Sequence, residues 1–160
     1  MNRFPLTKVQ KVVEIITWLV AVAALVWTLV CWGRLPDVVA IHYNALGAAD
    51  DWGGRWTVFL WPVLLLALCG SISFCMRLGL KHVNLPFRVN MEREWYVLRA
   101  VRDMLGLVNL EIAVTFAVMQ WCTLSGTNLP VWFTWVMMGV LLSTGAFGLW
   151  RAWNCNQGTM

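Results

Sequence analysis

The chain has 160 residues, of which 60% are hydrophobic and only 12% are charged, and its formal net charge is +4. Soluble domains carry about 25% charged residues, so this chain has too few charges to cover a water-facing surface, and its length suits one domain. The basic residues flank apolar runs and form no stripe interleaved with exposed aromatics, which excludes a typical nucleic-acid-binding protein. The composition therefore predicts an integral membrane protein whose surface is largely covered by lipid.

Four long apolar runs follow one another along the chain, each close to the ~20 residues that a helix needs to cross a hydrocarbon core. They predict an all-α chain that forms one transmembrane domain over residues 1–160, a four-helix transmembrane bundle. The helices are expected at about residues 12–33, 56–77, 104–123 and 129–151, with a loop at residues 34–55. The first run is too long for the apolar part of a cleaved signal peptide, so we expect this helix to be retained.

A further helical pattern precedes the third run. Asn90 is a suitable N-terminal cap for a helix that starts at Met91, and Trp95, Leu98 and Arg102 recur at helical spacing. A helix that continues from here through the third run is longer than a bilayer core, which predicts a cytoplasmic juxtamembrane helix before helix three. This segment either has no role beyond extending the helix or contacts a partner or anionic lipid.

Lysine and arginine are distributed unevenly between the two predicted sides. Ten of the twelve basic residues fall in the N-terminal tail, the second loop and the C-terminal tail: Arg3, Lys8, Lys11, Arg77, Lys81, Arg88, Arg93, Arg99, Arg102 and Arg151. The first loop carries only Arg34 and Arg55. Because cytoplasmic loops are enriched in lysine and arginine, this bias predicts an N-in/C-in topology in which residues 34–55 face outward.

The outward loop concentrates polar residues that the rest of the chain avoids. His42 and Asn44 are two positions apart, so in an extended segment they would project from the same face. The stretch from Asn44 to Gly47 predicts a turn, with Gly47 free to adopt a positive φ angle. A carboxylate from Asp50 or Asp51 is suited to cap the second helix, whose N-terminus carries a partial positive charge.

The order and spacing of these residues resemble a bacterial four-helix membrane domain of unknown function, which also forms the N-terminal part of SdpI-type immunity proteins. The pattern L-P-x-x-x-P-x-H-[FWY]-N-x-x-G-x-x-D-x-W is matched by Leu35, Pro36, His42, Tyr43, Asn44, Gly47, Asp50 and Trp52. Ala40 replaces the second proline, and SdpI-type proteins are longer, with a further C-terminal module. The resemblance implies this domain, in a multi-pass protein of the bacterial cytoplasmic membrane, and more distantly an immunity function.

Three interpretations of the motif stay open. It is a structural scaffold, a binding site for a peptide or small ligand, or a metal site. The candidate site residues are Pro36, His42, Asn44, Gly47, Asp50 and Trp52. Because the second histidine, His82, is expected on the opposite side, we favour no metal and no cofactor.

The five cysteines do not form a CxxC pair, which argues against a zinc ribbon or a thioredoxin-like site. Cys31 and Cys122 end two runs on the same predicted side, so a disulfide between them stays open.

Glu111 is the other candidate, because it is the one charged residue inside the third run. A carboxyl group at that depth is costly and should face the interior of the bundle, together with Thr115 four residues further on. We expect hydroxyl partners from Ser71, Ser73 or Thr17. A proton or cation relay and a protonated structural glutamate are equally compatible with the sequence.

No P-loop, G-x-S-x-G or H-E-x-x-H motif is present, so the protein is not expected to be an enzyme. The leading hypothesis is a non-enzymatic membrane protein that resists or senses an extracellular peptide, a toxin or envelope stress. One alternative is a small transporter or channel that uses Glu111, and another is an accessory subunit of a membrane complex. The expected partners are the lipid bilayer and either an extracellular peptide or a membrane protein, and an oligomer is compatible with the sequence.

Overall fold

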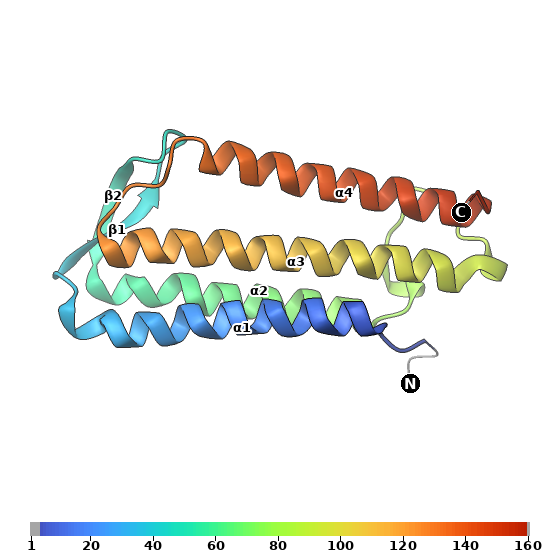
Figure 1. The fold of residues 1–160 in the computed structure, drawn as a ribbon, viewed down its shortest axis with the longest axis horizontal. Coiled ribbons are helices and arrows are strands. Elements are labelled where there is room, and N and C mark those ends of the chain that lie inside the picture. Colours follow the sequence, from blue (N-terminus) through green and yellow to red (C-terminus); the bar gives the residue numbers. More distant parts are fainter. Residues whose placement is uncertain (1–3, 160) are drawn as a thin grey trace.

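The computed structural model describes residues 4–159, so Arg3, one of the basic residues used to predict the topology, lies outside the described residues. Four long helices lie side by side, and a β-hairpin covers one end (Figure 1). The helices are α1 (Lys8–Cys31), α2 (Leu60–Arg77), α3 (Glu94–Ser125) and α4 (Phe133–Gln157). All four are long and apolar enough to cross a membrane, which confirms the four predicted spans and is consistent with a multi-pass membrane protein. The end at which α1 begins and α4 finishes, opposite the hairpin, is called the terminal end below (Figure 1).

Local signals explain where the helices begin and end. Thr7 and Gln10 form a capping box at the start of α1. Asn90 accepts a hydrogen bond from the backbone of Glu92 at the 3-10 turn that leads into α3, as the sequence predicts. Gly126 ends α3 in the left-handed conformation. Because α3 starts at Glu94, one continuous helix joins the segment before Met104 to the third apolar run.

Residues 34–55 are not an irregular loop, and the prediction of an all-α chain is wrong in this segment. Strands β1 (Val38–Tyr43) and β2 (Ala49–Gly54) pair antiparallel. Valine, isoleucine and tyrosine favour a pleated surface, and the turn at Asn44–Gly47 reverses the chain. Val39 and Tyr43 are buried, whereas β2 is largely exposed.

The four helices do not form a symmetric bundle. α3 packs against each of the other three helices, and α1 packs against α2. Small buried residues, including Ala21, Cys69 and Ala113, allow α1, α2 and α3 to approach closely. Within residues 4–159, α4 has extensive contact with only one helix, α3. That contact is tight at Gly148, where the Met104 side chain occupies the space that a Cβ atom would need.

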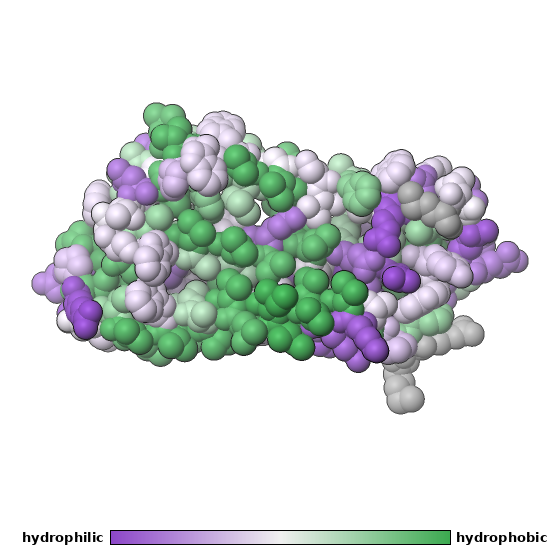
Figure 2. All heavy atoms as spheres, in the orientation of Figure 1, coloured by the Kyte–Doolittle hydropathy of each residue, from purple (hydrophilic) through white to green (hydrophobic). Residues whose placement is uncertain are grey.

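The surface has the pattern expected of a chain embedded in lipid. A broad apolar band runs along the helices, and hydrophilic residues gather at both ends, most densely at the terminal end (Figure 2). Inside the helices, two buried amide nitrogens donate to neighbouring helices: Gln120 Nε2 donates to Thr28 Oγ1 at 2.7 Å, and Asn109 Nδ2 donates to the Cys69 carbonyl oxygen at 3.3 Å. Cys31 and Cys122 are both free thiols.

Candidate functional site

The turn of the hairpin is built by the motif residues Asn44 and Gly47. The Asn44 side-chain oxygen accepts from the backbone N–H groups of Leu46 and Ala48, at 2.9 and 3.1 Å. Gly47 has a φ of 80°, which confirms the predicted positive φ angle. Asn44 therefore leaves the strand and holds the turn, so the expectation that it shares a face with His42 is wrong.

The turn lies directly on the link between α3 and α4. The Gly47 carbonyl oxygen accepts from the Leu129 backbone N–H at 2.9 Å, and the Ala49 N–H donates to Asn128 Oδ1 at 3.2 Å. A Cβ atom on Gly47 would overlap the Leu129 backbone oxygen, so this close approach requires glycine. The geometry of the turn thus serves to dock the hairpin on the helices.

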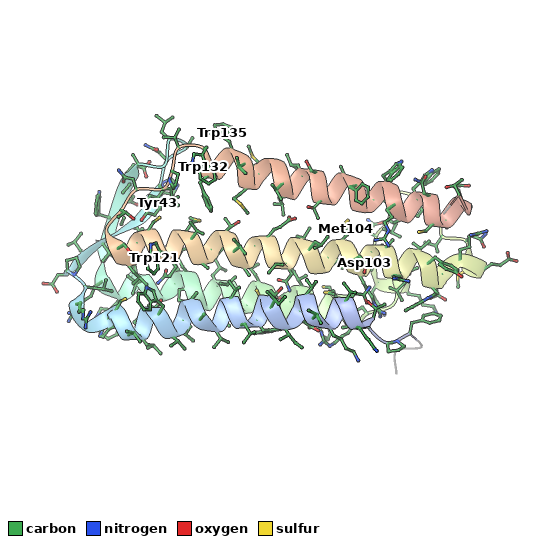
Figure 3. The ribbon with its side chains drawn as sticks, viewed as in Figure 1. Tyr43, Asp103, Met104, Trp121, Trp132 and Trp135 are labelled. Carbon is green, nitrogen blue, oxygen red and sulfur yellow. The ribbon has the colours of Figure 1, made fainter. Side chains whose placement is uncertain are left out.

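Tyr43 anchors the hairpin from inside. Its side chain is buried with Cys122, Leu129 and Phe133, and its hydroxyl oxygen lies 3.2 Å from Thr123 Oγ1. Burial raises the pKa of the Tyr43 phenol above its ordinary value, so the group stays protonated and can donate. Figure 3 shows Tyr43 at the hairpin end, near the start of α4.

His42 and Asp50 form a pair on the exposed side of the hairpin. His42 Nδ1 lies 2.6 Å from Asp50 Oδ1, and the two side chains are 63% and 42% exposed. The expectation that Asp50 or Asp51 caps the second helix is wrong, because both lie within β2 and Gly54 holds the cap position of the turn before α2. Among residues 4–159, no group of three or more His, Cys, Asp or Glu side chains is arranged to hold a metal ion.

Pro36 and Trp52 line a different space. A cavity of about 320 Å³ lies between the first part of the hairpin and the link that follows α3, and both residues contribute to its wall. The six motif residues therefore do not converge on one point. Two build the turn, two form an exposed pair, and two line this cavity.

Glu111 lies in a separate cavity of about 330 Å³ between α3 and α4. Thr144 of α4 donates to Glu111 Oε1 at 2.5 Å, and Thr115 donates to the Glu111 backbone oxygen at 2.7 Å. Glu111 Oε2 is buried and has no hydrogen-bond partner among the described residues. The expected partners are wrong, because Ser71 and Thr17 donate to carbonyl groups of their own helices and the Ser73 hydroxyl accepts from Asn109. Thr144 takes this role instead.

This cavity connects Glu111 to the motif. Its walls are mostly apolar, and Tyr43 and Thr115 line it together with Glu111. A small hydrophilic patch interrupts the apolar band between α3 and α4 in Figure 2. An unpartnered carboxyl oxygen in an apolar cavity favours a ligand that supplies a hydrogen-bond donor, since leaving such an atom unpaired costs about 1–3 kcal/mol.

Sequence reasoning missed a second polar cluster, at the terminal end. Glu14 is not among the residues that the sequence singles out, but its carboxylate is 10% exposed and accepts two hydrogen bonds from Arg77, at 2.6 and 3.0 Å. Asp103, which Figure 3 shows on α3 near this end, accepts from Gln10 and Arg151. The sequence did offer a signal for this cluster, because its polar residues all lie near those ends of the apolar runs that are predicted to face the same side.

The fold defines a helical membrane protein with four candidate spans and a β-hairpin at one end. In comparisons with known proteins, residues 19–66 match the domain of unknown function DUF1648. This stretch covers the second half of α1, the hairpin and the start of α2, which includes all six motif residues. No curated protein and no solved structure matches the chain.

Proposed function

We propose that the protein is a non-enzymatic, SdpI-like protein of the bacterial cytoplasmic membrane that resists or senses an extracellular peptide or toxin. The hairpin end faces outward, and the hairpin and the α3–α4 cavity together form the recognition site. The observation that carries this proposal is that Tyr43 of the hairpin and Glu111 of α3 line the same cavity. A ligand that approaches the hairpin can thus reach the unpartnered oxygen of Glu111.

The chemistry of the site favours a cationic, amphipathic ligand. The hairpin segment carries three aspartates against two arginines, and Glu111 adds a further acidic group. The cavity walls include Phe116, Met119 and Met137, and methionine side chains adapt to apolar groups of different shape. A helical peptide with one apolar face and lysine side chains matches both properties.

The test uses bacteria that express the protein and a synthetic amphipathic peptide of leucine and lysine. Expression of the wild type should raise the inhibitory peptide concentration, and Glu111→Gln should lower it about tenfold, since a charge-assisted hydrogen bond contributes about 1.5–3 kcal/mol. His42→Ala should also reduce protection while the protein stays folded, because an exposed pair contributes little stability.

Glu92→Gln is the matched control, because Glu92 is an exposed carboxylate in the 3-10 turn before α3, at the end of the molecule away from the hairpin. It should protect as well as the wild type. Full protection by both Glu111→Gln and His42→Ala, at equal membrane abundance, would contradict the proposed recognition site.

A second candidate function is a small transporter or channel that uses Glu111 as a proton or cation site. The buried, unpartnered Oε2 atom favours it, because a carboxyl group in lipid-embedded surroundings commonly serves ion pathways. Reconstituted protein should then show a pH-dependent cation flux that Glu111→Gln abolishes. Absence of flux for sodium, potassium and protons, with peptide protection intact, would eliminate this candidate and leave the first one standing.

A further inference from the structure

A second cavity, of about 250 Å³, lies at the terminal end between α1, α3 and α4. It is far from the hairpin, since Arg102 and Asp103 lie near the start of α3 and the hairpin lies near its end (Figure 1). Its polar wall contains Arg99, Arg102 and Arg151. The recognition site proposed above uses none of these residues.

The cavity has an excess of positive charge. Asp103 is the one acidic residue in its wall, and its two oxygens are already used. Oδ1 accepts from Gln10 Nε2 at 2.7 Å, and Oδ2 accepts from Arg151 Nη1 at 2.8 Å. One carboxylate therefore balances one of three guanidinium groups, which favours an anionic ligand.

Arg102 is the most informative residue of this wall. Its side chain is among the largest fully buried ones, with 1% of the residue exposed. Nη1 donates to the Phe4 carbonyl oxygen at 2.9 Å, but Nε and Nη2 have no hydrogen-bond partner among the described residues. A buried charged group with unpaired donors is costly, so a ligand that pairs with them stabilises the fold.

The geometry of the two unpaired donors, Nε and Nη2 of Arg102, determines which kind of anion fits. Nε and Nη2 lie along one edge of the guanidinium plane and donate in parallel, the geometry that matches two oxygens of a phosphate or carboxylate group. A lysine side chain at this position would carry the same charge but could not donate two parallel hydrogen bonds. The unused donors of Arg102 thus form a two-pronged site for an oxyanion.

The other wall of the cavity is apolar. Val9, Val13 and Leu107 contribute to it, and Val9 and Leu107 are 70% and 47% exposed. The apolar band meets the hydrophilic residues of the terminal end (Figure 2), the end at which α1 begins. A ligand that fills this cavity therefore has an anionic head beside the arginines and apolar chains along α1 and α3.

We propose that this cavity binds an anionic phospholipid, whose phosphate group pairs with Nε and Nη2 of Arg102 and whose acyl chain lies against Val9, Val13 and Leu107. Arg99 and Arg151 add attraction for the negative charge. Binding fixes α1 and α4 on α3 at the terminal end, since the cavity is lined by residues of all three helices. It makes the anionic lipid a structural component of the protein, in whichever leaflet this end lies.

The test compares the purified protein in nanodiscs of phosphatidylcholine with and without phosphatidylglycerol, with native mass spectrometry to count retained lipids. The wild type should retain phosphatidylglycerol in preference and unfold at a higher temperature in its presence. Arg102→Lys keeps the charge but loses the two-pronged edge, and it should bind phosphatidylglycerol about tenfold more weakly. Arg88→Met, which removes an exposed charge from the loop before α3, should behave as the wild type.

Three results would overturn the proposal. The first is equal retention of phosphatidylglycerol by Arg102→Lys and the wild type. The second is an equal loss in Arg88→Met, which would mean that the effect is not specific to Arg102. The third is the same stabilisation by millimolar inorganic phosphate in phosphatidylcholine nanodiscs, which would assign the site to a soluble anion.

Discussion

Gly47→Ala should release the hairpin from the helices. At a φ of 80°, an alanine is strained, and its Cβ atom would overlap the Leu129 backbone oxygen. The backbone must move, and the hydrogen bond from the Leu129 N–H to Gly47 is lost. Strain and the lost bond together amount to at least about 2 kcal/mol. Hydrogen exchange of the Leu129 amide should therefore accelerate about thirtyfold.

Gly54→Ala is the matched control for this substitution. Gly54 also belongs to the hairpin, but its φ is −62° and nothing lies within 4 Å of the position of an added Cβ atom. Exchange at Leu129 should stay at the wild-type rate in this variant. Unchanged exchange in Gly47→Ala would mean that the hairpin does not depend on this contact for its docking.

The helices could be predicted from the sequence because the length of each apolar run is enough to identify them. A run of about 20 apolar residues has few alternatives to a helix when its backbone must satisfy its own hydrogen bonds. The hairpin lacked such a signal, because Val38–Tyr43 was read as part of a polar loop rather than as a strand. Its core forms only when Ala40 and Tyr43 meet Cys122, Leu129 and Phe133 from distant parts of the chain.

The candidate site was predictable in its residues and not in its arrangement. The resemblance singled out Asn44 and Gly47, and a positive φ at Gly47 followed from local turn chemistry. The partner of Glu111 was not predictable, because it depends on which helix packs against that face of α3. α1 and α2 were expected to supply it, whereas α4 does so through Thr144.

The uncharged polar residues inside the helices were also not used to predict which helix faces pack together. Asn109 and Gln120 interrupt the third apolar run, and both are 1% exposed. Each donates to a neighbouring helix, so both carry information about which faces of α3 point inward. Sequence reasoning weighed only the charged residue in this run and so missed them. Uncharged polar residues in membrane helices are thus a better guide to packing than the apolar pattern alone.

The ion pair between Glu14 and Arg77 should have an asymmetric effect on stability. Arg77→Met leaves the Glu14 carboxylate, which is 10% exposed, without its two charged donors. Loss of one partner of a buried pair costs about 3–5 kcal/mol, and the lower end applies because the Arg77 side chain is 52% exposed and water can enter. Glu14→Gln should cost less, since the Arg77 side chain can turn toward water.

The measurement is the free energy of unfolding of each variant in mixed micelles, followed by circular dichroism. The double variant Glu14→Leu with Arg77→Met should be more stable than Arg77→Met alone, because no buried charge is left unpaired. Asp37→Asn is the control, since Asp37 belongs to a 4.0 Å pair with Arg55 and its side chain is 94% exposed, so its stability should hardly change. A larger loss for Glu14→Gln than for Arg77→Met would show that desolvation of an unpaired Glu14 carboxylate is not the dominant cost.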